Sequence, residues 1–146
     1  MSMEKLLENI MTSGFLMYKR LSRGIPSSYI SRNQFELLYS IVLENGKPMK
    51  YFGDKLMISK PNLTVMADKL IEEGYVEREF DPNDRRVIIL RVTKKGEDFL
   101  YEEVKRIKQE MSKSFDSLSN QDVQRLNELL NEINGIFNKL DQGDKI

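Results

Sequence analysis

The chain has 146 residues and a mass of 17.1 kDa, the size of one domain with one core. Lys plus Arg and Asp plus Glu number 23 each, so the formal net charge of +0 indicates no partner by itself. Hydrophobic residues make up 40%, which excludes a disordered chain, and no apolar run reaches the ~18 residues of a membrane span. The N-terminal segment mixes both charges and does not resemble a secretory signal, so we expect a cytoplasmic protein without membrane contact.

The sequence contains no Cys and no His. Their absence excludes disulfides, thiol-based redox sensing, Ser-His-Asp triads and zinc sites built from these residues. It also contains no Gly-rich phosphate loop of the P-loop or dinucleotide-binding type. We therefore expect no metal, no cofactor and no enzymatic activity.

Apolar residues recur at spacings of three and four between residues 3 and 21, which predicts a first helix. A loop follows, and Ser31 with Gln34 forms the capping-box pattern that begins a second helix. The second helix is predicted to run to about Glu44 and to be stopped by Asn45-Gly46.

Two short helices are predicted next. The first runs from Pro48 to Met57, and we interpret its Gly53 as a site of close helix packing. The second is opened by Ser59-Lys60-Pro61 and stopped by Gly74. Its inner face consists of Leu63, Met66, Ala67, Leu70 and Ile71. Two short helices joined by a brief turn are typical of a helix-turn-helix.

The hydrophobic period changes to two at Tyr75, where YVEREF and part of VIILRV from Val87 predict two strands. The segment DPNDRR between them has the composition of a turn, so the strands form a hairpin, and a helix-turn-helix followed by such a hairpin is a winged helix. From Asp81 to Lys95, five basic residues stand against two acidic ones, a local charge of +3.

Thr93 can cap the next helix, and Ser119 with Asp122 predicts the start of the last one. The last helix has apolar residues at steps of three and four, like a coiled-coil seam. We expect the first and last helices to pack together across a homodimer interface, and an intrachain helical hairpin is the alternative. The expected dimerisation residues are Leu6, Leu7, Ile10, Leu126, Leu130, Ile133, Phe137 and Leu140.

The predicted fold is mainly α with a small β-hairpin wing: a winged helix-turn-helix flanked by N- and C-terminal dimerisation helices. Within a single domain, we expect a dimerisation helix and loop in residues 1–30, a DNA-binding winged helix in 31–96, and C-terminal dimerisation helices in 97–146.

This order of elements points to DNA, because the fourth helix can enter the major groove while a basic hairpin reaches phosphates or the minor groove. An ordinary solvated helix face, and arginines paired with nearby carboxylates, are the plainer alternatives. Asn62 could pair with adenine, Lys60 with guanine or a phosphate, and Val65 could contact a thymine methyl. The candidate DNA-binding residues are Ser59, Lys60, Pro61, Asn62, Thr64, Val65, Lys69, Arg85 and Arg86.

The sequence GYVEREFDPNDRRVIILRVTKKG, residues 74–96, resembles the signature of the MarR family of winged-helix transcriptional regulators. QFELL from Gln34 fits the same family. The signature residues in matching places are Asp81, Asp84, Arg86, Thr93 and Gly96. The resemblance implies a homodimer on a near-palindromic operator. It also implies that Arg86, with Arg85 beside it, enters the minor groove, and that Asp84, a further DNA-site residue, orients the guanidinium.

The resemblance further implies a small aromatic effector bound between the DNA-binding and dimerisation regions. Candidate pocket residues are Met11, Phe15, Tyr18 and Tyr39, although stripes of this kind are ordinarily core. The sequence names no effector-binding residue beyond them. Members that sense peroxide through a cysteine or bind zinc through histidines are poor guides to this chain.

The sequence thus predicts a homodimeric, sequence-specific DNA-binding transcriptional regulator, a repressor released by an effector. The alternative is a winged helix used as a protein-protein assembly module without specific DNA binding. A catalytic function would need converging acid and base residues, and the sequence suggests none.

Overall fold

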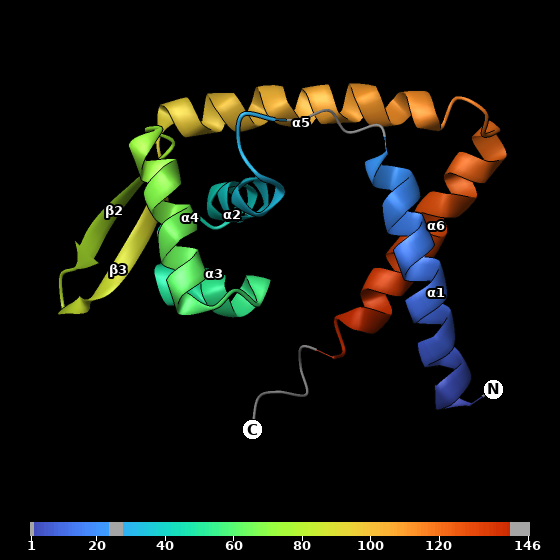
Figure 1. Cartoon of the computed structure of the whole chain (residues 1–146), viewed down its shortest axis with the longest axis horizontal. Helices are drawn as coiled ribbons and strands as arrows, with labels where there is room; N and C mark the ends of the chain where they lie inside the picture. The colour runs from blue at the N-terminus through green and yellow to red at the C-terminus, as the bar shows by residue number, and fades with distance from the viewer. Residues whose placement is uncertain (1, 24–27, 141–146) are drawn as a thin grey trace. The chain divides into compact units, whose positions relative to one another are not determined.

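Figure 1 shows a computed structural model of the chain, which describes residues 2–23 and 28–140. The chain divides into two compact units. One comprises residues 1–25 and 110–146, and the other residues 26–109. The fold is mainly helical with a small antiparallel sheet, which confirms the predicted fold class.

The 26–109 unit contains the core. It consists of α2 (Arg32–Leu43), α3 (Met49–Leu56), α4 (Lys60–Glu72) and most of α5 (Lys94–Ser114), with strands β1 (Lys47–Pro48), β2 (Val76–Asp81) and β3 (Asp84–Val92). The buried hydrophobic residues among those described all lie here: Ile30, Leu37, Leu38, Ile41, Phe52, Leu63, Ala67, Leu70, Tyr75, Val76, Leu90 and Leu100. The one expected core therefore belongs to this unit.

The start of α2 is the predicted capping box. Ser31 Oγ accepts a hydrogen bond from the Gln34 backbone N at 3.2 Å, and Gln34 Oε1 accepts one from the Ser31 backbone N at 2.8 Å. Upstream, Ser28 Oγ donates to the buried Glu103 carboxylate of α5 at 2.7 Å. The pKa of Glu103 is lowered, first by the hydrogen bond from Arg106. These contacts hold the segment before α2 against α5.

Helices α3 and α4 form the predicted helix-turn-helix. A Cβ added to Gly53 would lie 3.0 Å from Leu63 Cδ2, so the two helices approach closely at this glycine. The interpretation of Gly53 as a close-packing site is confirmed. The turn between the helices contains Met57 in the left-handed conformation, with φ of 53° and ψ of 45°.

The sheet has the order β1-β3-β2 and is antiparallel throughout. The β2-β3 hairpin is the predicted wing, with Val76 opposite Val92 and Phe80 opposite Ile88. Strand β1 was not predicted, and the interpretation of Asn45-Gly46 as a simple helix stop was incomplete. Gly46 has φ of +85°, and its backbone N donates to the Leu90 carbonyl at 3.1 Å, so it leads the chain into β1.

The other unit contains α1 (Met3–Ser22), the end of α5 and α6 (Asn120–Phe137). Helix α6 begins at the predicted cap, where Ser119 Oγ accepts from the Asp122 backbone N at 3.1 Å. It ends at Phe137, so Leu140 lies beyond the helix into which its spacing had placed it. Neither α1 nor α6 buries a residue. In residues 2–23 and 28–140, no helix is long and apolar enough to span a membrane.

Candidate nucleic-acid interface

The wing ends in a tight turn stabilised by its own aspartates. Asp81 Oδ1 accepts a hydrogen bond from the Asn83 backbone N at 2.8 Å. Asp81 and Asp84 lie opposite each other in the register of the two strands. Pro82 and Asn83 form the tip and are exposed. The turn therefore places the first residues of β3 at the far end of the wing, as the DPNDRR segment predicted.

Arg86 and Asp84 form a two-point pair on β3. Arg86 Nε donates to Asp84 Oδ1 at 3.1 Å and Nη2 donates to Oδ2 at 3.2 Å, while the Arg86 backbone N also donates to Oδ1. These bonds lower the pKa of Asp84, the side-chain bond most. The Arg86 side chain is still 91% exposed. The guanidinium is thus held in one orientation while most of its surface stays available to a ligand.

Arg85 is in a different position from its neighbour. Successive side chains of a strand point to opposite faces, so Arg85 and Arg86 are directed away from each other. Arg85 is exposed, and within the described residues no carboxylate holds it. Of the two adjacent arginines, Arg86 is therefore held in one orientation and Arg85 is unrestrained.

Helix α4 presents the outward face that the sequence predicted. Its buried residues are Leu63, Ala67 and Leu70. Thr64 is half-buried, and its hydroxyl donates to the Lys60 carbonyl at 3.0 Å, so that hydroxyl is free only to accept. The exposed candidates are Ser59, Lys60, Pro61, Asn62, Val65 and Lys69.

Two interactions that position this surface were missed by the sequence analysis. Arg78 Nη1 of β2 donates to Asp68 Oδ1 of α4 at 3.2 Å, which links the wing to α4. Glu44 Oε2, after α2, accepts from Tyr51 at 2.6 Å and from Lys55 at 2.9 Å, which holds α3. These hydrogen bonds lower the pKa of Glu44, and the bond between Tyr51 and Glu44 raises the pKa of Tyr51.

The predicted dimerisation residues and effector-pocket candidates are also exposed. The large apolar side chains exposed on α1 and α6 have exposed fractions between 36% and 75%. Met11, Phe15 and Tyr18 are on α1 and Tyr39 is on α2, and none of them is a core residue of the chain. Within the described residues, no group of three or more acidic side chains is arranged to hold a metal ion.

Comparisons with known proteins bear on this arrangement. Residues 30–88 match the family model described as MarR family. The chain is 24% identical over 113 residues to the HTH-type transcriptional regulator MhqR of Bacillus subtilis (strain 168), covering 77% of this chain and 78% of MhqR. A solved MarR family protein from Bacillus stearothermophilus has a TM-score of 0.76 at 18% identity, over 94% of this chain and 99% of that one.

A mutant MarR from E. coli complexed with operator DNA has a TM-score of 0.66 at 22% identity, over 88% of this chain and 95% of that one. The family model over residues 30–88 and these structural neighbours together support a MarR-type winged-helix fold. MarR family transcriptional regulators are non-enzymatic DNA-binding proteins. The comparisons support the prediction of a DNA-binding regulator.

Proposed function

We propose that this chain is a MarR family member and a homodimeric repressor that binds a near-palindromic operator and is released from it by an effector. The observation that carries the proposal is Arg86, which Asp84 holds in one orientation while it stays 91% exposed. An exposed cation fixed at the tip of a hairpin suits insertion into a narrow, electronegative minor groove. A repressor must reach chromosomal DNA, so the cytoplasm is its place of action in this proposal.

Sequence reading falls to α4, the recognition helix. Its exposed N-terminal part would lie in the major groove, with Asn62 on an adenine and Val65 against a thymine methyl. Lys60 would contact guanine or a phosphate. Glu72 and Glu73, at the other end of the helix, would be repelled by phosphates, so they stay off the duplex.

A second copy of the chain is the partner that the apolar helices α1 and α6 require. An isolated soluble chain rarely exposes a long apolar stripe, and these helices bury no residue in the single chain. Pairing them across a two-fold axis gives two recognition helices. Their separation must be near 34 Å for both to enter successive major grooves.

Effector release follows from linkage. A ligand lowers operator affinity only if it binds the DNA-incompetent geometry of the dimer more tightly than the competent one. A small aromatic compound is the proposed effector.

Fluorescence anisotropy tests the proposal. Labelled duplexes from the region upstream of the protein's own gene, and scrambled versions of them, are titrated with protein at several salt concentrations. A dimer neutralising about six phosphates gives a log-log salt slope near −5, with tighter binding to the upstream duplex. Weak, salt-insensitive association with every duplex, including selected genomic fragments, would instead support a protein-protein assembly module.

A further inference from the structure

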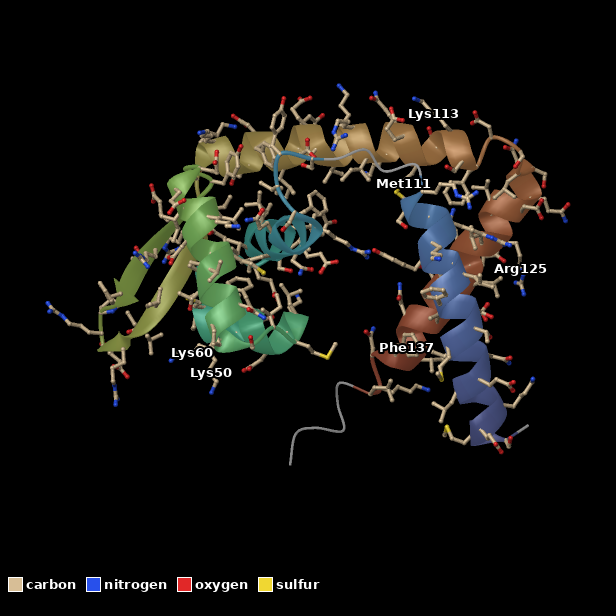
Figure 2. All side chains as sticks on the ribbon, in the orientation of Figure 1. Lys50, Lys60, Met111, Lys113, Arg125 and Phe137 are labelled. Atoms are coloured by element: carbon tan, nitrogen blue, oxygen red, sulfur yellow. The ribbon has the colours of Figure 1, made fainter. Side chains whose placement is uncertain are left out.

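A groove separates the recognition helix from the wing. It has a volume of about 710 Å³ and lies between α3, the start of α4 and β3. The charged side chains that line it are Lys50, Lys60 and Arg86, against Asp54 alone. Figure 2 shows Lys50 and Lys60 projecting from the same end of the α3-α4 pair. The groove is therefore predominantly cationic.

Its two lysines are available to a ligand. Lys50 and Lys60 are exposed, and their side-chain ammonium groups make no hydrogen bond or ion pair with any residue that the structure describes. Lys55, on the same helix as Lys50, is instead paired with Glu44 at 2.9 Å. Lys50 was absent from the candidate residues because its position outside the fourth helix gave the sequence analysis no reason to select it.

The geometry of B-DNA indicates which part of a bound duplex would lie in this groove of the protein. The major and minor grooves of a duplex are separated by one sugar-phosphate strand. If α4 lies in the major groove and Arg86 in the adjacent minor groove, that strand must pass between α4 and β3. The groove occupies this space, and Thr64 in its wall can accept but not donate a hydrogen bond beyond its own helix.

We infer that the groove holds this strand and that Lys50 binds one of its phosphates from α3. The inference rests on the proposed DNA binding and adds to it a contact outside both the recognition helix and the wing. Lys60 faces the same strand from α4, while Met49, Val87 and Ile88 supply apolar surface for the deoxyribose rings. Lys50 thus fixes how deeply α4 enters the major groove, without reading a base.

The test compares Lys50→Gln with Lys105→Gln by anisotropy on the labelled upstream duplex between 50 and 200 mM salt. Lys105 is exposed on α5, outside the groove, and each substitution removes one positive charge, so the two have the same effect on net charge. If Lys50→Gln loses one phosphate contact per half-site, the log-log salt slope of the dimer becomes less steep by about 1.8. Between 50 and 200 mM salt, the affinity of the variant should then fall about 12-fold less than that of the wild type. Lys105→Gln and Lys50→Arg should keep the wild-type slope, and discrimination against the scrambled duplex should be unchanged in all three.

The possible outcomes of this comparison lead to different conclusions. A wild-type slope in Lys50→Gln would leave the groove to another anion and overturn the assignment. Equal flattening in Lys50→Gln and Lys105→Gln would also overturn it, because the effect would then report net charge rather than contact. Failure of the wild-type protein to bind any duplex would overturn the proposed function and this inference together, and circular dichroism verifies that every variant is folded.

Discussion

Arg78 Nη1 donates a hydrogen bond to Asp68 Oδ1 at 3.2 Å, and this pair joins strand β2 of the wing to recognition helix α4. Neither residue is buried, so the pair contributes little to the free energy of unfolding. In the proposed complex, the pair would set the angle between the two elements that lie in adjacent DNA grooves.

Breaking this pair should therefore affect DNA binding more than stability. In a double-mutant cycle of Arg78→Ala and Asp68→Ala, urea denaturation should give a coupling free energy of about 0.2 to 1 kcal/mol. Operator affinity should fall in each single variant. Each variant should lose discrimination between the upstream and scrambled duplexes. A loss of several kcal/mol of stability would show that the pair is structural and not a positioning contact.

Removing the wing cation should weaken operator binding. We expect Arg86→Ala to cost about 1 to 3 kcal/mol of binding free energy while the oligomeric state stays unchanged. Arg85→Ala is the matched control, since Arg85 is the adjacent cation on the opposite strand face. Equal losses in the two variants would mean that the wing acts through its total charge rather than through the oriented guanidinium.

The pair with Arg86 also makes a prediction about titration. The pKa of Asp84 is lowered in the folded protein, so the pair stabilises the fold at pH values above the unfolded-state pKa of Asp84. That contribution is lost as the pH falls through the lowered folded-state pKa. In Arg86→Gln, the pKa of Asp84 measured by carboxyl NMR should rise toward its ordinary value of 3.8. An unchanged titration would place the cause of the shift elsewhere.

The proposed dimer interface is tested by a charge in the apolar stripe of α6. Ile133→Asp should put an unpaired carboxylate into an apolar interface and convert the dimer to monomer in multi-angle light scattering. Asn131→Asp adds the same charge two residues away on the same helix and should remain dimeric. If Ile133→Asp also remains dimeric, the interface does not include this part of α6.

The turn between α3 and α4 stores strain at Met57, a residue in left-handed conformation whose side chain is 93% exposed. A side chain costs about 1 to 2 kcal/mol in this conformation, which glycine adopts freely. Met57→Gly should therefore stabilise the fold by about 0.5 to 1 kcal/mol after the entropy that glycine adds to the unfolded chain. Met57→Ala keeps the strain and should change the urea midpoint little. Stabilisation by both substitutions would point to the Met side chain rather than to the backbone.

What the sequence could predict depended on whether the signal was local. Each of the correctly predicted features spans only a few residues of the sequence. They are the capping pairs at Ser31 and Ser119, the helical periods, and the turn before Arg86, and the structure contains all of them. Strand β1 is only two residues long, which is too short for a period, and it exists because Lys47 pairs with Leu90.

Contacts between residues further apart in the sequence were not predicted, because they leave no local pattern. Asp68 and Arg78, and Glu44 with Tyr51 and Lys55, meet only after the helices and wing have packed. The Asp84-Arg86 pair spans two residues, and the family resemblance indicated it. Lys50 was missed because its relation to Lys60 and Arg86 appears only as a shared groove.

The most direct measurement is a DNase I footprint of the purified protein on the DNA upstream of its own gene and on selected genomic fragments. The account predicts one protected segment containing two similar half-sites with centres about one helical turn, or 34 Å, apart. Protection should be lost in Arg86→Ala at the same protein concentration. A cleavage pattern that is identical with and without protein on every fragment would contradict the account.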